Sequence, residues 1–207
     1  MIKVIAEPGA VELVVRGSRF IAEARSAAER AVVDGVVAEL RREHHRAAHV
    51  CFAYRLGLER VEEFSTDAGE PSGTAGKPML DALRSFGVGD ALVTVIRYFG
   101  GTKLGIRGLI DAYGGVARAA LEAASVTRVA PYRRWRALVT YAALDALRNR
   151  VGELGGRFEA LEYGAGVDVE LAFPAEADID GWLAGLTGGG ALTELEELDG
   201  AWLPADD

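Results

Sequence analysis

Three features that would mark particular classes of protein are scarce in this sequence. It has one cysteine, Cys51, so no disulfide can form within the chain, and a single thiol agrees with a reducing compartment. No apolar run approaches the ~18 residues that a membrane-spanning helix needs. Glu7, Glu12, Arg16 and Arg19 interrupt the first twenty residues, so we expect no signal peptide there. These absences predict a cytoplasmic protein with no membrane partner.

A net positive charge, the usual mark of a nucleic-acid-binding protein, is also absent, because the 207 residues carry a net charge of −8. The charge is uneven, however. Residues 1–131 hold 17 Lys+Arg and 16 Asp+Glu, a net +1, whereas residues 132–207 hold 6 and 15, a net −9. Such a charge asymmetry is typical of two units with different surfaces. The basic residues of the nearly neutral first unit can still cluster on one part of its surface. We therefore expect two domains, 1–131 and 132–207, joined by a hinge at 131–136.

Hydrophobic periodicity predicts an α+β fold in the first domain. We expect two strands within 11–25, a helix at 26–43, a strand pair within 50–65, a helix at 78–86, a strand at 91–99 and a helix at 108–124. The strand at 91–99 is apolar almost throughout, which is typical of a central strand covered on both faces. The second domain reads as strand, helix, strand, strand, helix, strand, and that βαββαβ order predicts a ferredoxin-like domain.

The first segment that could carry chemistry is the glycine-rich loop at 65–78. Its three glycines and several hydroxyls precede a helix, and Lys77 adds a positive charge. A helix N-terminus offers free backbone N–H groups, and glycines let a ligand approach them closely, so the loop can act as a cradle for an anion. It is not a phosphate-binding P-loop, because Pro78 follows Lys77 where Ser or Thr is required. The alternative is a purely structural loop held by hydroxyl hydrogen bonds.

The second segment, 97–108, places Arg97 at the end of the apolar strand and then a glycine-rich turn. A buried arginine needs a carboxylate or a ligand, and Asp67 and Glu70 are the candidate partners within the chain. Two such strand–loop–helix junctions with cations can share one cleft. The candidate residues for binding an anion or nucleic acid are Gly73, Thr74, Gly76, Lys77, Arg97, Gly100, Gly101, Lys103 and Arg107, with Asp67, Glu70 and Ser72 supporting the loop.

We assign no catalytic residue, metal or cofactor from the sequence. His45 and His49 are four residues apart, but a change from helix to strand separates them, so they need not share a face. His49 and Cys51 alternate on one strand and so share a face, yet nothing marks Cys51 as an activated thiol rather than a small buried residue. Asp67 and Glu70 could act as an acid–base pair. We favour a binding protein over an enzyme.

The stretches HVCFAYR at 49–55, DAGEPSGTAGKP at 67–78 and VIRYFGGTKLG at 95–105 resemble the IMPACT/YigZ family, and the resemblance covers about residues 15–125. The chain departs from the family pattern at Ala68, where a second aspartate is usual, and at Arg107, where glycine is usual. The first departure weakens a paired-aspartate role, and the second adds a cation to the turn. The remainder of the chain is similar to the small domain that follows in bacterial members.

The resemblance implies that the first domain has the fold of elongation factor G domain IV and the GHMP kinases, and that the second resembles elongation factor G domain V. It also implies a role in regulating translation, through protein partners in the eukaryotic relatives. Our leading interpretation is a translation-associated protein that binds RNA or the ribosome through a glycine-rich cationic cleft. The alternatives are a small-molecule phosphotransferase or hydrolase using the same cleft, and a protein-interaction module. The sequence gives no oligomeric state.

Overall fold

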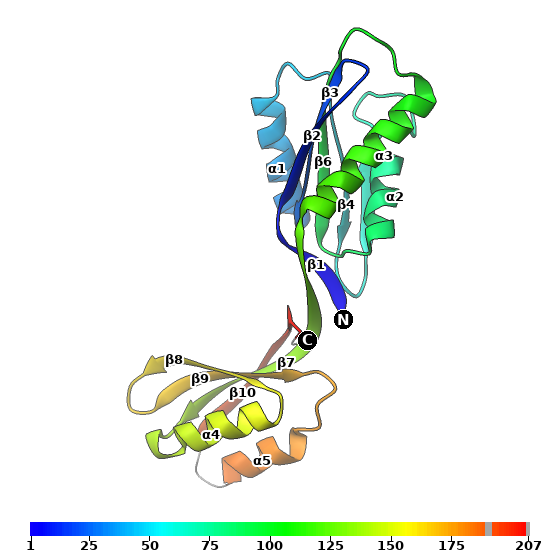
Figure 1. Cartoon of the computed structure of the whole chain (residues 1–207). Helices are drawn as coiled ribbons and strands as arrows, with labels where there is room; N and C mark the ends of the chain where they lie inside the picture. The colour runs from blue at the N-terminus through cyan, green and yellow to red at the C-terminus, as the bar shows by residue number, and fades with distance from the viewer. Residues whose placement is uncertain (189–191, 206–207) are drawn as a thin grey trace. The chain divides into compact units, whose positions relative to one another are not determined.

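The structure, a computed structural model, describes residues 1–188 and 192–205. The chain divides into two compact units, Ile2–Arg128 and Val129–Asp207, with Met1 counted with the second (Figure 1). Each unit packs helices against an antiparallel sheet around its own apolar core, which confirms the α+β class. Among the described residues, no helix is long and apolar enough to cross a membrane.

The first domain is built on a five-stranded sheet. Its elements are β1 (Ile2–Glu7), β2 (Gly9–Val15), β3 (Ser18–Ser26), α1 (Arg30–Glu43), β4 (His49–Leu56), β5 (Glu62–Thr66), α2 (Gly76–Phe86), β6 (Ala91–Tyr98) and α3 (Gly105–Ala123). The strand order is β2-β3-β6-β4-β5, with every neighbouring pair antiparallel. The central position of β6 explains its continuous apolar sequence, as predicted.

Helices cover both faces of this sheet, α1 on one side and α2 with α3 on the other (Figure 1). Side chains on a strand alternate between the faces. Accordingly Val93 and Val95 of β6 join the core beneath α2 and α3, whereas Leu92 joins the core beneath α1. Arg97 continues the series of Val93 and Val95, so the alternation carries its charge toward the layer of α2 and α3.

The two glycine-rich loops that the sequence singles out as candidate binding segments lie at one end of the domain. Strands β3 and β4 begin there, and β5 and β6 end there, as the pairing of Arg19 with Tyr98, His49 with Arg97 and Phe52 with Thr66 shows. The loop 67–75 leads from β5 into α2, and the loop 99–104 leads from β6 into α3. The antiparallel topology therefore brings both glycine-rich loops to the same end of the sheet.

The second domain contains β7 (Ser125–Val139), α4 (Tyr141–Glu153), β8 (Arg157–Tyr163), β9 (Val167–Pro174), α5 (Asp180–Gly188) and β10 (Leu192–Pro204). The βαββαβ order is the one expected from the sequence, and the strand order is β10-β7-β9-β8. Trp135, Leu171 and Phe173 form part of its core. The hinge expected at 131–136 is wrong, because these residues lie inside β7, where they pair with β9 or β10.

Candidate anion-binding site

The first glycine-rich loop is organised around the carboxylate of Asp67. Its Oδ2 accepts a hydrogen bond from the backbone N–H of Gly73 at 2.8 Å, and its Oδ1 accepts from Ala75 at 2.8 Å and Gly76 at 2.9 Å. Burial alone would raise the pKa of Asp67, but the backbone N–H donors from Gly73 to Gly76 outweigh it and lower the pKa. The carboxylate of Asp67, an anion from within the chain, therefore occupies the N-terminus of α2.

Arg97 lies in a buried network with Glu70. Its NH1 donates to Glu70 Oε1 at 2.6 Å, and the two side chains are only 7% and 3% exposed. The hydroxyl of Tyr113, on α3, donates to the same carboxylate oxygen at 2.8 Å, and His49 Nε2 is 3.7 Å from it. Of the two partners that the sequence offered for Arg97, the structure selects Glu70, because Asp67 is engaged with the start of α2.

Cys51 sits beneath the same loop and is fully buried. Its Sγ donates to the carbonyl oxygen of Asp67 at 3.1 Å and lies 3.6 Å from the Tyr113 hydroxyl. Burial raises the pKa of the Cys51 thiol to about 12, so the thiol stays protonated at neutral pH and is not an activated nucleophile. His49 faces the same loop, with Nδ1 2.9 Å from the carbonyl oxygen of Ala68. Both side chains therefore hold the loop in place.

The two glycine-rich loops meet at a pocket of about 270 Å³. Glu70 and Pro71 line it from the first loop, and Arg97, Phe99 and Lys103 line it from the second. Since Glu70 neutralises Arg97, Lys103 is the cation of this pocket that has no carboxylate partner among the described residues. Most of the lining of this pocket is apolar, and its charge is small.

The other predicted residues lie around this pocket without lining it. Lys77 is exposed at the start of α2, and Arg107, with its side chain 87% exposed, pairs with Asp111 on α3 at 3.1 Å. Thr74 is buried, and its hydroxyl donates to the carbonyl oxygen of Pro71 at 2.7 Å. Ser72 is exposed on the loop.

Gly100 and Gly101 form the exposed turn after β6, and Gly100 also touches the turn between β2 and β3. A Cβ added at Gly100 would stand 1.9 Å from the carbonyl carbon of Gly17, and the Gly100 N–H donates to Ser18 Oγ at 3.3 Å. This close approach places Arg16 and Arg19, which flank Gly17 and Ser18, beside the second glycine-rich loop. Neither arginine was a candidate from the sequence, where they lie some eighty residues away from that loop.

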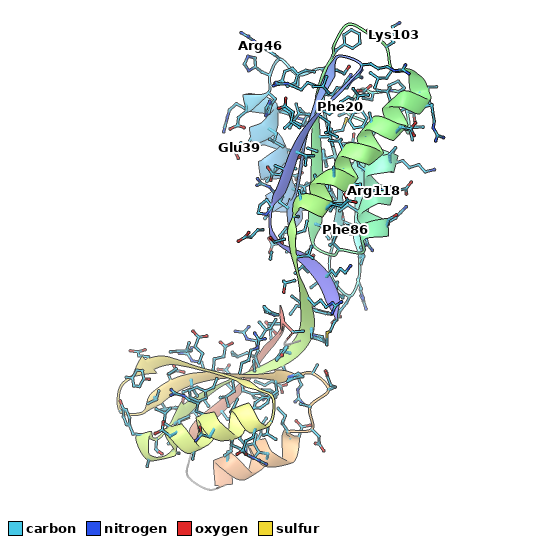
Figure 2. All side chains as sticks on the ribbon, viewed as in Figure 1. Phe20, Glu39, Arg46, Phe86, Lys103 and Arg118 are labelled. Atoms are coloured by element: carbon cyan, nitrogen blue, oxygen red, sulfur yellow. The ribbon has the colours of Figure 1, made fainter. Side chains whose placement is uncertain are left out.

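The end of α1 reaches the same place. His44 Nδ1 is 2.8 Å from the Tyr98 hydroxyl, and the Ala48 N–H donates to the carbonyl oxygen of Arg97 at 2.9 Å. Figure 2 shows Arg46 and Lys103 at the same end of the domain. We call the exposed surface formed by these cations the basic end; it comprises Arg16, Arg19, Arg41, Arg42, Arg46, Lys103 and Arg107.

The basic end gathers three segments of sequence that are far apart. Arg41 and Arg42 lie in the last turn of α1. A cluster of three or more His, Cys, Asp or Glu able to hold a metal does not occur among the residues that the structure describes. The gathered cations suit electrostatic binding of an anionic surface.

Comparison with known proteins places this chain among relatives of similar length. Residues 16–121 match the model of the Impact N-terminal domain. The IMPACT family member YvyE of Bacillus subtilis is 32% identical over 93% of each chain. The IMPACT family member YigZ of Escherichia coli is 35% identical over 82% of this chain and 84% of its own. A crystal structure described as a hypothetical protein is 32% identical, covers 95% of this chain and 97% of its own, and has a TM-score of 0.67.

Proposed function

Since the chain belongs to the IMPACT family, we propose that it is a translation-associated regulator that binds RNA or the ribosome through the basic end of its first domain. The family resemblance implies the connection to translation. The proposal that RNA is the partner rests on one observation, which is that cations from three distant segments gather at one end of a domain whose net charge is close to zero.

The charges at the basic end are largely available for a ligand. Within the described part of the chain, Arg16, Arg41, Arg46 and Lys103 have no ion-pair partner. The remaining three are paired only at the surface: Arg19 with Glu12 at 3.6 Å, Arg42 with Glu39 at 3.8 Å and Arg107 with Asp111 at 3.1 Å. Exposed ion pairs of this kind contribute little to stability and are weakened by salt. RNA phosphates can therefore compete for these cations.

Phe99 gives the basic end a surface on which a base can stack. It is 53% exposed, although it follows the most buried strand of the domain. Tyr98 is less available, because its hydroxyl is bonded to His44 and the Arg19 guanidinium lies over its ring at 4.6 Å. An exposed aromatic ring among unpaired cations is the arrangement that single-stranded nucleic acid binds without strict sequence preference.

The proposal shifts the expected contacts from the cleft to the surface around it. Arg97 is buried and neutralised by Glu70, and the N–H groups at Gly73 and Gly76 are occupied by Asp67. RNA phosphates can contact the exposed arginines of the surface, whereas Arg97 is buried and already neutralised. Lys103 is the candidate residue that belongs to both the pocket and the surface.

The test is binding of a fluorescently labelled single-stranded RNA to the full chain, followed by anisotropy at several salt concentrations. Each phosphate neutralised adds about −0.7 to the slope of log K against log salt for a single strand. We expect Arg16→Gln and Arg46→Gln each to weaken binding and to flatten the slope by about that amount. The matched control is Arg118→Gln, an exposed arginine on α3 away from the basic end (Figure 2), which should change neither.

A slope near zero in the wild type, or equal effects of Arg16→Gln and Arg118→Gln, would remove the RNA proposal. A second experiment tests whether the full chain co-purifies with ribosomes. If the chain captured ribosomal or regulatory proteins in a manner insensitive to nuclease and to the Arg16 and Arg46 substitutions, the protein-interaction alternative would replace it.

A further inference from the structure

The outer face of α3 carries a regular pattern of charge that RNA binding at the basic end does not explain. Five exposed residues follow one another along this face at helical spacing, and they are Arg107, Asp111, Gly115, Arg118 and Glu122. Residues three or four positions apart lie on the same face of a helix. The face therefore presents a positive and a negative charge, then a glycine, and then a positive and a negative charge again.

This pattern is complementary to itself when it is read in the opposite direction. If two copies of α3 cross antiparallel at Gly115, Arg107 of one copy lies opposite Glu122 of the other. Asp111 of one copy then lies opposite Arg118 of the other, and the two-fold axis repeats both pairs. A parallel arrangement would instead place like charges together. Because a two-fold interface uses the same patch on both subunits, a second copy of this chain is the partner that the face fits.

The charges of this face are available for such a contact. Within residues 1–188 and 192–205, Arg118 and Glu122 have no ion-pair partner. Arg107 and Asp111 pair with each other at 3.1 Å, but their side chains are 87% and 59% exposed, and exposed pairs of this kind are weak. All four side chains can therefore meet opposite charges on a second copy.

The middle of the face allows another helix to approach closely. A Cβ added at Gly115 would meet open space, so packing within the chain does not require a glycine there, and glycine is among the poorest helix formers. Beside Gly115, α2 and α3 enclose two adjoining pockets of about 390 and 300 Å³, and both are lined by Ala82, Ser85 and Arg118. Since small side chains reduce the distance at which two helices pack, this groove can receive side chains from a helix that crosses at Gly115.

We propose that the chain forms a two-fold homodimer through α3, with the two helices antiparallel and Gly115 at the axis. The contact involves one helix face and the groove beside it, so the interface is small and the dimer is weak, with a dissociation constant in the micromolar range. The proposal shares only Arg107 with the basic end, and it does not depend on RNA binding.

The experiment is sedimentation velocity of the full chain at protein concentrations from about 2 to about 500 μM. We expect the weight-average sedimentation coefficient to rise with concentration from that of a monomer to that of a dimer. Gly115→Gln places a larger side chain at the axis and should weaken dimerisation about tenfold. Its matched control is Gly35→Gln, because Gly35 is likewise an exposed helical glycine with open space around it, on α1, and this variant should dimerise as the wild type does.

An exchange of charges tests the pairing itself. Asp111→Arg and Arg118→Asp each place like charges opposite one another, and each should weaken dimerisation about tenfold at low salt. The variant that carries both changes restores opposite charges across the axis, and it should recover most of the wild-type affinity. Two changes that merely damaged the surface of α3 would add to each other instead of cancelling.

The variants also separate this proposal from RNA binding. Arg118→Gln should weaken dimerisation and leave RNA binding unchanged, because Arg118 lies outside the basic end, whereas Arg16→Gln and Arg46→Gln should do the reverse. A wild type that stays monomeric up to about 500 μM would overturn the proposal. It would also be overturned by equal effects of Gly115→Gln and Gly35→Gln, or by a double charge variant that dimerises no better than the single ones.

Discussion

The buried pair of Arg97 and Glu70 gives the sharpest test of how the first domain is held together. Glu70→Ala removes the carboxylate that accepts from Arg97 NH1 at 2.6 Å and from the Tyr113 hydroxyl at 2.8 Å. A guanidinium with a 7% exposed side chain is then left without its counter-charge, and removing one partner of a buried pair costs about 3–5 kcal/mol. We expect the free energy of unfolding of the first domain to fall by that amount.

The distribution of tryptophan allows this loss to be assigned to one domain. The chain has three tryptophans, Trp135, Trp182 and Trp202, and all lie in the second unit. Urea unfolding followed by tryptophan fluorescence therefore reports the second domain, whereas far-ultraviolet circular dichroism reports both. In Glu70→Ala, the circular dichroism transition should acquire an early phase while the fluorescence midpoint stays at its wild-type position.

Two comparison variants separate an uncompensated charge from simple loss of a side chain. Glu70→Leu combined with Arg97→Met replaces the pair by apolar groups, and it should recover most of the stability lost in Glu70→Ala. Glu63→Ala breaks the more exposed pairs with Arg55 and Arg84 and should cost no more than about 1 kcal/mol. A loss in Glu70→Ala no larger than that in Glu63→Ala, or a double variant less stable than Glu70→Ala, would refute the reasoning.

Two further predictions concern the loops themselves. Asp67→Asn replaces one acceptor oxygen with an amide donor opposed to a backbone N–H, and it should destabilise the first domain by about 2 kcal/mol in urea unfolding at neutral pH. The folded-state pKa of Asp67 is lowered, so its contribution to stability is fully present above the unfolded pKa of about 3.9 and is lost as pH falls through the folded pKa. The difference in the free energy of unfolding between wild type and Asp67→Asn should therefore disappear in acid. A difference that does not change with pH would contradict this. Gly100→Ala should cost about 3 kcal/mol because its Cβ would stand 1.9 Å from Gly17, whereas Gly101→Ala, with a φ of +86° but open space around it, should cost about 1 kcal/mol. Equal thermal midpoints for the two alanine variants would show that the contact with Gly17 is not the cause.

Much of the fold follows from local patterns. Alternating and continuous apolar runs predict the strands, and the helical stripe of Val33 and Val37 predicts α1, because these periods depend only on neighbouring residues. The apolar run at 91–99 also indicates that β6 is central. The hinge was misplaced because Pro131 suggested a break, whereas proline is tolerated in β7, where its carbonyl still accepts a hydrogen bond from Ala175.

The candidate site was only partly determined by its sequence motifs. Composition identifies both glycine-rich loops and the need of Arg97 for a carboxylate, since a charge at the end of an apolar strand must be neutralised. It does not say that Glu70 meets Arg97 while Asp67 occupies the start of α2. That choice depends on the path of the loop 67–75 and on the register that sets His49 opposite Arg97.

By itself, then, the sequence determined the α+β class and the position of the central strand, and it singled out the two glycine-rich loops, because these depend on short-range periodicity and residue type. Only the tertiary structure decided which charges are free. It paired Arg97 with Glu70 and placed the carboxylate of Asp67 at the N-terminus of α2. It also brought Arg16, Arg46 and Lys103 to one end of the domain, since spatial neighbours in an antiparallel sheet are set by strand order and not by distance along the chain.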